Sequence, residues 1–439
     1  MGGGLLQLVA YGAQDVYLTG NPQITFFKVV YRRHTNFAIE AIQQTASGSN
    51  SLGSRATYQI TRNGDLIHRV YFYGKLKNTS TSASSKKVAL VPHVGQKLLK
   101  TVELEIGGQR IDKHYSEWLY IWNELSLPYG KREGYYKMIG ANKENCCTEL
   151  AHTTNNSYEL YVPLEFWFCR NVGLALPLIA LQYHEVKINI EYETADNLCD
   201  VGPSNYCIEN DKADGSANVT ANFEKTLTLD DSTLWVDYIF LDTDERRRFA
   251  QLSHEYLIEQ LQFTGTDTIT SSSVNSDSMK SMRMNFNHPC KELIWAIKRS
   301  DEPSVYWNNF STANKDQNAG TGTDVTFNNY IVSSNPVMQA KIMLNGNDRF
   351  ATRKGEYFSL VQPYQHHENT PDMYHKGINV YSFALKPEEH QPSGTLNMSR
   401  IDTAVLSLSS KITGTIFIFA VNYNVLRILS GMGGLAYSN

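Results

Sequence analysis

Asn63-Gly64-Asp65-Leu66-Ile67-His68-Arg69-Val70-Tyr71-Phe72 is a strand-like run in the first half of the chain. It has a counterpart in the second half, Asn287-His288-Pro289-Cys290-Lys291-Glu292-Leu293-Ile294-Trp295-Ala296. After a loop, each run leads to a second strand pattern that contains a tight-turn pair, at residues 100–111 in the first half and 339–350 in the second. The same two patterns therefore occur twice and in the same order.

The two halves continue to agree beyond these runs. Each next shows an aromatic strand pattern, at residues 161–168 and 380–385, and then a break that contains glycine or proline. A final alternating run follows, at residues 186–192 and 404–409. Because order and approximate spacing are kept, we predict two tandem copies of one β-domain.

The alternation within these runs predicts antiparallel strands with one covered face. Val102, Leu104 and Ile106 alternate with polar residues, and residues 186–192 repeat this pattern. A period of two with one polar face is typical of a β-sandwich. The pairs Gly107-Gly108 and Asn345-Gly346 follow the matching strands as tight turns.

Helices are predicted at only two places, both between strands of the first half. Residues 115–127 have apolar residues at helical spacing and end before Pro128. Residues 131–142 form a second short candidate. Both are expected to decorate a loop of the sandwich.

The chain is predicted to divide near residue 242. Residues 235–241 read as the last strand of the first copy, and residues 242–248 are a charged connector with three arginines. We expect an amino-terminal arm at 1–26, a first β-domain at 27–242, a charged linker at 243–254 and a second β-domain at 255–439.

Composition excludes several classes of function. The 439 residues carry a net charge of −4, so the chain has no global attraction to phosphate or anionic lipid. The six cysteines have neither the spacing of a disulfide framework nor a CxxC motif, which favours reduced thiols. No secretory signal and no apolar run long enough for a transmembrane segment are present, so we expect a soluble protein made inside the cell.

Histidine and glutamate clusters are the candidates for a metal site. His366 and His367 precede Glu368, and Glu388-Glu389 precede His390. Neither cluster has the spacing that places two imidazoles on one face of a strand or helix. Both are therefore predicted to be solvated loops, and we expect no metal and no cofactor.

Catalytic candidates are equally weak. His184 and His254 could act as bases, but no nucleophile motif accompanies them, and a hydrogen-bonded structural histidine is the simpler interpretation of His184. Glu103 and Glu105 are predicted to be solubilising charges on the solvent face of a strand. No phosphate-binding loop is present. We predict that the chain has no catalytic residue.

Asn-x-Ser/Thr triplets mark possible exposed loops. They are frequent in a chain this rich in asparagine, serine and threonine, so they are weak signals. The preferred glycosylation candidates are Asn309, Asn218 and Asn78.

Long contiguous motifs over nearly the whole chain resemble one known family. The motifs lie at residues 11–28, 31–37, 107–115, 173–186, 347–355, 391–395 and 423–437. They are similar to the major capsid proteins of large icosahedral nucleocytoplasmic DNA viruses, especially those of chlorella-infecting algal viruses.

The resemblance implies an all-β double jelly roll of two tandem eight-stranded antiparallel sandwiches, with short helices in the loops. Three copies would form a pseudo-hexagonal capsomer that contacts neighbouring capsomers. The arm would face inward, toward neighbours or minor capsid proteins, and an internal viral membrane would lie nearby without direct contact to nucleic acid. Loops 78–99 and 299–337 would form an outer crown that is glycosylated in the family. The protein would be made and assembled in the host cytoplasm and reside in the virion capsid.

The chain departs from the family at residues 409–414, where a short hairpin is predicted in place of a longer loop. It could be a variant subunit used at particular positions, or the main subunit of another virus. Two other functions remain alternatives: a carbohydrate-binding or carbohydrate-cleaving jelly roll, suggested by the many tyrosines and tryptophans, and a nucleic-acid-binding scaffold. The acidic isoelectric point, near 6.3, argues against the scaffold.

Overall fold

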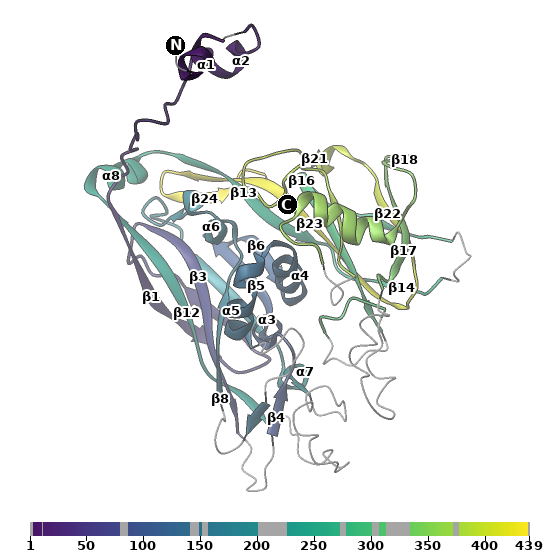
Figure 1. Cartoon of the computed structure of the whole chain (residues 1–439). Helices are drawn as coiled ribbons and strands as arrows, with labels where there is room; N and C mark the ends of the chain where they lie inside the picture. The colour runs from purple at the N-terminus through teal and green to yellow at the C-terminus, as the bar shows by residue number, and fades with distance from the viewer. Residues whose placement is uncertain are drawn as a thin grey trace. The chain divides into compact units, whose positions relative to one another are not determined.

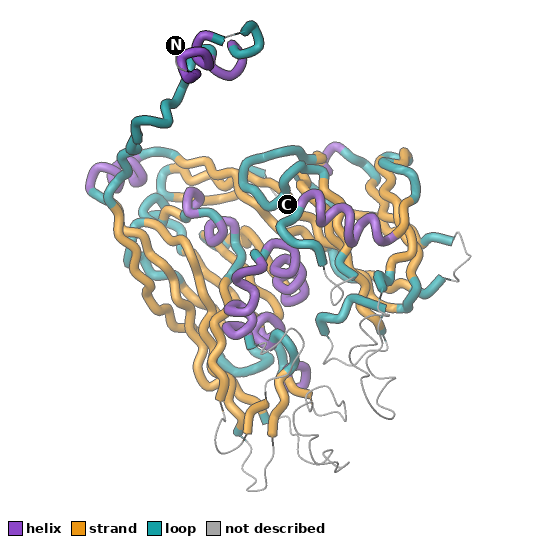
Figure 2. Tube along the Cα trace, viewed as in Figure 1, coloured by secondary structure: helices purple, strands orange, loops and turns teal. Residues whose placement is uncertain are grey.

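The computed structural model describes residues 3–10, 12–79, 87–140, 149–151, 157–200, 226–272, 278–300, 307–312, 334–371 and 377–437. The chain forms two compact units, Met1–Phe37 and Ala38–Asn439. The first unit contains two short helices, α1 (Gly3–Val9) and α2 (Val16–Thr19), which the sequence analysis did not predict. The second unit contains all the sheets, which Figures 1 and 2 show.

The first half of the second unit is a sandwich of two four-stranded layers. One layer has the strand order β6-β5-β10-β2 and the other has the order β1-β12-β3-β8. A short pairing between β1 and β2 joins the layers at one edge. The strands are β1 (Phe37–Gly48), β2 (Arg55–Gln59), β3 (Leu66–Asn78), β5 (Leu99–Ile106), β6 (Gln109–Tyr115), β8 (Ser157–Pro163), β10 (Val186–Tyr192) and β12 (Leu227–Leu241).

The second half repeats this topology strand for strand. Its layers have the orders β18-β17-β22-β15 and β13-β23-β16-β20. The strands are β13 (His254–Phe263), β15 (Lys280–Met284), β16 (Pro289–Arg299), β17 (Val337–Leu344), β18 (Asn347–Asp348), β20 (Asn379–Ser382), β22 (Ala404–Ser410) and β23 (Gly414–Leu429). The predicted duplication and the double jelly roll are confirmed.

Shorter elements complete both halves. The additional strands are β4 (Lys87–Leu90), β7 (Glu149–Ala151), β9 (Leu176–Pro177), β11 (Cys199–Asp200), β14 (Asp267–Ile269), β19 (Arg353–Lys354), β21 (Leu396–Asn397) and β24 (Met432–Leu435). The helices are α3 (Val94–Leu98), α4 (Ser116–Ser126), α5 (Tyr129–Ile139), α6 (Trp167–Arg170), η1 (Val172–Leu174), α7 (Ala195–Leu198), α8 (Thr243–Gln251), η5 (Tyr357–Val361), α10 (Gln362–His366) and η6 (Met398–Arg400).

The two predicted tight turns are present and equivalent. Gly107 and Gly108 have φ values of 58° and 84°, and Asn345 and Gly346 have φ values of 50° and 80°. Positive φ at both central residues is what a two-residue hairpin loop of type I′ requires, which explains the glycine and asparagine. Each turn connects equivalent strands, β5 to β6 and β17 to β18.

Both predicted helices of the first half are confirmed as α4 and α5. The charged connector is itself helical, because α8 begins after Asp242, whose side chain accepts a hydrogen bond from the backbone N–H of Thr243. Arg248 pairs within this helix, with Glu245, whereas Arg246 reaches Asp65 at the entry of β3.

Three predicted elements differ in the structure. The first aromatic strand ends at Pro163 and the chain turns into α6, while the second ends at Ser382. The predicted hairpin at 409–414 is wrong, because β22 and β23 belong to different layers of the second sandwich. The chain crosses there between layers, and Gly414 is required because a Cβ would lie 2.0 Å from the carbonyl oxygen of Lys298.

Each sandwich has its own interior. In the first, the hydroxyl of Tyr58 on β2 lies 2.6 Å from that of Tyr192 and 3.0 Å from that of Ser232, which connects the two layers. In the second, Trp295 on β16 is fully buried, and its ring centroid lies 5.2 Å from that of Phe358. Among the described residues, no helix is long and apolar enough to cross a membrane.

We expect Trp295→Ala to lower the free energy of unfolding by about 3–5 kcal/mol, because it removes a fully buried aromatic side chain and leaves a cavity. The control is Tyr129→Ala, whose side chain is 81% exposed and whose removal should change stability by less than about 0.5 kcal/mol. Guanidinium unfolding followed by circular dichroism compares the two. Equal losses would contradict the assignment of Trp295 to the core.

Candidate functional site

The junction between the two jelly rolls brings together side chains from both halves of the chain. The layer β13-β23-β16-β20 is covered on both faces. On β16, Leu293, Trp295 and Ile297 point into the second sandwich, whereas Ile294 and Ala296 join the core cluster of the first half. This double burial explains why residues 293–297 of β16 form a continuous apolar run instead of alternating.

Aromatic side chains of the first half cover the outer face of this layer. Trp118 on α4 lies 5.4 Å from Phe419 on β23, measured between ring centroids. Tyr115, at the end of β6, lies 4.9 Å from Phe263 on β13. Such pairs add to the burial of apolar area and fix the position of α4 on the sheet.

Backbone groups also cross the junction. The side chain of Asp112 on β6 accepts a hydrogen bond of 3.1 Å from the backbone N–H of Leu261 on β13. The Nδ1 atom of His184 lies 2.8 Å from the carbonyl oxygen of Gly433. His184 is therefore a structural histidine, as predicted, and its partner is the carboxyl-terminal strand β24.

Buried charges form a first ionic cluster at the junction. Glu259 on β13 pairs with Lys291 at 2.7 Å and with Arg170 of α6 at 3.0 Å. Burial alone would raise the pKa of Glu259, but the charges of Arg170 and Lys291 and the hydrogen bonds from His390 and Lys291 lower it to about 2. The Arg170 guanidinium also lies 4.9 Å from the ring centroid of Trp122 on α4. One carboxylate thus holds α6 of the first roll to the second roll.

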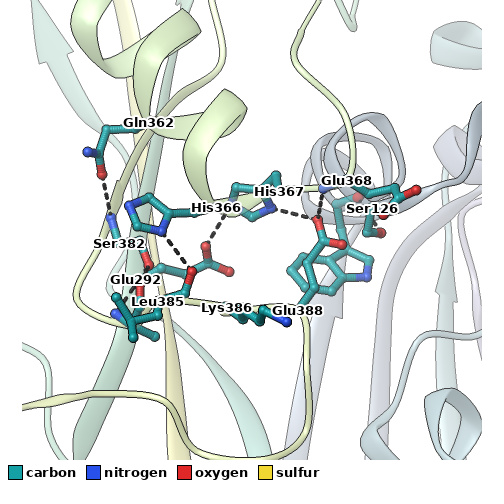
Figure 3. Close-up of polar contacts among 12 residues, drawn as sticks. Ser126, Glu292, Gln362, His366, His367, Glu368, Ser382, Leu385, Lys386 and Glu388 are labelled. Carbon is teal, nitrogen blue, oxygen red and sulfur yellow. Dashed lines mark hydrogen bonds and ion pairs between the residues drawn. The ribbon is translucent and has the colours of Figure 1, made fainter. Parts of the chain in front are cut away.

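A second ionic cluster surrounds His367, which Figure 3 shows. Its imidazole lies 2.9 Å from the carboxylate of Glu292 and 2.8 Å from that of Glu388, and the side chains of His367 and Glu292 are fully buried. Burial alone would lower the pKa of His367, but Glu292 and Glu388 raise it to about 9. At neutral pH His367 is therefore an imidazolium between two carboxylates.

The polypeptide around His367 also contacts the first roll. The backbone N–H of Asn369 donates a hydrogen bond of 3.0 Å to the carbonyl oxygen of Leu125 on α4. Figure 3 shows Glu388 next to Ser126, near the end of the same helix. The second cluster therefore holds in place the loop that contacts the carboxyl-terminal end of α4.

The fold thus unites the two histidine and glutamate motifs that the sequence analysis placed in solvated loops. That prediction was wrong for His367, because the strand residue Glu292 lies beneath it. His366 points elsewhere, with Nδ1 2.9 Å from the carbonyl oxygen of Leu385. Among the described residues, no group of three or more histidine, cysteine or carboxylate side chains is arranged to hold a metal ion. The charged pair Lys291-Glu292, directly before the apolar run 293–297 of β16, is the sequence signal that could have identified this site.

The remaining sequence candidates have structural roles. His254 lies with Nε2 2.8 Å from the carbonyl oxygen of Phe249 at the end of α8. Glu103 on β5 is half-buried and pairs with both Arg55 on β2 and Lys113 on β6, so it links three strands of one layer and is not a plain solubilising charge. Cys169 and Cys290 are free thiols, Cys199 is buried, and Cys146, Cys147 and Cys207 lie outside the described residues.

The glycosylation candidates occupy different environments. Asn78 is the last residue of β3. Its side chain is buried and accepts a hydrogen bond from the hydroxyl of Thr226. The side chain of Asn309 is also buried and accepts from the hydroxyl of Ser311. Asn218 lies outside the described residues. Glycosylation at these positions stays a prediction.

Apolar and aromatic side chains that are exposed or half-buried form two surfaces that the sequence analysis missed. The helix surface consists of Leu360, Val361 and Tyr364 on η5 and α10. The aromatic sheet surface consists of Tyr71 and Tyr73 on β3, Trp235 on β12 and Tyr161 on β8. Their apolar character was visible in the sequence, but their exposure depends on the packing of the layers.

Two family models match the chain. The model described as "Major capsid protein N-terminus" matches residues 25–242. The model described as "Large eukaryotic DNA virus major capsid protein" matches residues 245–434. Together the models include both jelly rolls.

Known relatives are similar over the full length. The major capsid protein of Pyramimonas orientalis virus is 50% identical over 462 aligned positions, which cover 100% of both chains. That of Paramecium bursaria Chlorella virus 1 is 45% identical over 482 positions, again covering 100% of both. A quasi-atomic model of the PBCV-1 virus capsid superposes with a TM-score of 0.73 at 40% identity, covering 94% of this chain and 100% of that one.

We expect His367→Ala to lower the free energy of unfolding by about 3–5 kcal/mol, because it leaves the Glu292 carboxylate buried without a counter-charge. Adding Glu292→Gln should recover part of this loss. The control is His366→Ala, which removes one contact to a backbone carbonyl. Denaturant unfolding measures all three variants, and a loss no larger than that of the control would contradict a role for the cluster in stability.

The pH dependence of stability should carry the signature of His367. Its pKa rises from 6.5 to about 9 on folding, so its contribution is complete below pH 6.5 and is lost as the pH rises through 9. Glu259 has the opposite sign: its pKa falls from 4.5 to about 2, so its contribution is complete above pH 4.5 and is lost toward pH 2. The stability difference between the unmodified chain and His367→Gln should shrink between pH 6.5 and pH 9. A constant difference across this window, measured by unfolding at each pH, would refute the assignment.

Proposed function

Because the chain belongs to the major capsid protein family of large eukaryotic DNA viruses, we propose that three copies associate into a pseudo-hexagonal capsomer that tiles the icosahedral shell. The chain is a structural protein of the virion capsid and not an enzyme. It forms the shell of a large DNA virus by assembling with copies of itself.

The repeated topology is the observation that most directly supports the proposed trimer. A hexagonal outline built from three chains needs two similar blocks in each chain, and the two sandwiches match strand for strand. The blocks must also hold a fixed angle to one another. The covered layer and the two buried ionic clusters supply that rigidity, since moving the rolls apart would expose apolar side chains and unpair charges.

We propose the division of the chain that the sequence suggests: an arm at 1–26, jelly rolls at 27–242 and 255–439, and a linker at 243–254. Helix α8 lies within this linker, and β13 begins at His254, its last residue. A helical linker supports rolls that are held side by side rather than loosely tethered.

The amino-terminal unit is suited to contact other proteins of the shell. Its apolar side chains are largely exposed within the chain, among them Tyr17 at 92%, Phe26 at 87% and Phe27 at 97%. Exposed apolar residues at this density favour burial by a partner. Neighbouring capsomers and minor capsid proteins beneath the shell are the proposed partners.

The outer crown and the site of assembly complete the proposal. The predicted crown loops 78–99 and 299–337 are wrong in part, because residues 90–99 and 307–311 are buried within the chain. We propose that the remaining parts of the two loops face outward and carry glycans, and that an internal membrane lies beneath the shell. The net charge of −4 supports a shell without direct contact to the genome. Synthesis and assembly would take place in the host cytoplasm.

We expect native mass spectrometry of the purified chain to show a trimer that persists on dilution, because subunit interfaces of capsomers bury large apolar areas. The dilution series should run from micromolar to nanomolar concentrations. A chain that is monomeric at every concentration would contradict the proposed capsomer. Failure to retain DNA on a filter at low salt is the matching expectation for the absence of nucleic-acid contact.

A further inference from the structure

The equivalent layers of the two rolls differ in how their outer faces are covered. In the second roll, the outward pair Ile294 and Phe419, on β16 and β23, is buried beneath α4 of the first roll. In the first roll, the corresponding strands are β3 and β12, and their outward pair is Tyr71 and Trp235. This pair is only half-buried within the single chain.

The uncovered face of the first roll is strongly aromatic. Tyr73 and Tyr161 are register partners on β3 and β8, and their ring centroids lie 5.0 Å apart. Tyr161 is 42% exposed. In Figure 1, β3 and β12 lie at the left of the first roll and the second roll lies at the right. Tyr71 borders a pocket that is also lined by Trp122 of α4 and by Glu388.

The covering element is also duplicated. Helix α4 lies between β6 and β8 of the first roll, and η5 with α10 lies between the equivalent strands β18 and β20 of the second. Trp118, the side chain of α4 that contacts the sheet, is buried. On η5 and α10, by contrast, Leu360, Val361 and Tyr364 are 45%, 40% and 81% exposed.

In the described part of the chain, both halves of this junction therefore occur twice, once in contact with each other and once without such a contact. The occupied copy joins α4 to the layer β13-β23-β16-β20. The free cover is the helix surface on η5 and α10, and the free face is the aromatic sheet surface on β3, β8 and β12. A ring closes when the free cover of each chain meets the free face of the next, which is a heterologous contact.

We propose that a second copy of this chain occupies the aromatic sheet surface, with its helix surface packed against Tyr71, Tyr73, Tyr161 and Trp235. The junction inside the chain is then the template for the junction between chains. This assignment rests on the proposed trimer and adds the side chains that form its interface. Tyrosine and tryptophan are the residues that most often dominate the energy of such contacts.

The first test compares two tyrosines of equal exposure. Tyr364→Asp places a charge in the proposed interface, whereas Tyr129→Asp changes a residue on α5 that is also 81% exposed. Native mass spectrometry over a dilution series should show at least a tenfold weaker trimer for Tyr364→Asp and an unchanged one for Tyr129→Asp. Circular dichroism should show that both variants fold. A Tyr364→Asp trimer as tight as the unmodified one, or equal weakening by both variants, would overturn the assignment.

A second test locates the contact without weakening it. The photoreactive residue p-benzoylphenylalanine, placed at position 364, is irradiated in a mixture of ordinary and nitrogen-15-labelled chains, and mixed-isotope peptides are identified. We expect crosslinks to peptides that contain Tyr71, Tyr73, Tyr161 or Trp235. Crosslinks to other surfaces, such as that around Tyr183 and Met432, would refute this interface and leave the trimer standing. An unmodified chain without a trimer would overturn both the interface and the proposed capsomer.

Discussion

Burial of one sheet on both faces is the constraint on which the rest of the structure depends. One face of the layer β13-β23-β16-β20 lines the interior of the second sandwich. Its other face packs against α4 and β6 of the first half. Strand β16 of this layer is therefore apolar on both sides over residues 293–297. The two rolls consequently share one continuous core cluster and behave as a single block.

The same constraint determines the chemistry of the junction. A charge on a sheet without a solvent face must be paired, since an unpaired buried charge is strongly destabilising. Glu259 is paired with Lys291 and Arg170, and Glu292 is paired with His367. The opposite pKa shifts of Glu259 and His367 follow from this pairing. Both groups therefore contribute fully to the free energy of unfolding only at mildly acidic pH.

Duplication without divergence of topology is the basis of the proposed capsomer. The first roll keeps the strand order of the second, but in the described part of the chain its outward residues Tyr71 on β3 and Trp235 on β12 are only half-buried. That face carries tyrosine and tryptophan where the covered face carries isoleucine and phenylalanine. Aromatic residues with a polar atom tolerate water before assembly and lose little on burial afterwards, which suits a surface that alternates between exposure and contact.

The sequence by itself determined the elements whose information is local. Alternation defined the strands, the pairs Gly107-Gly108 and Asn345-Gly346 defined equivalent turns through their positive φ, and order along the chain revealed the duplication. Only the tertiary structure decided which charges are buried, because His367 and Glu292 are 75 positions apart (367 − 292) and meet through the packing of a loop on a sheet. It also decided that residues 409–414 cross between layers, since a hairpin and a crossing share the same local pattern and differ only in the partners of each strand. Short-range patterns specify backbone conformation, whereas burial and pairing depend on contacts between distant segments.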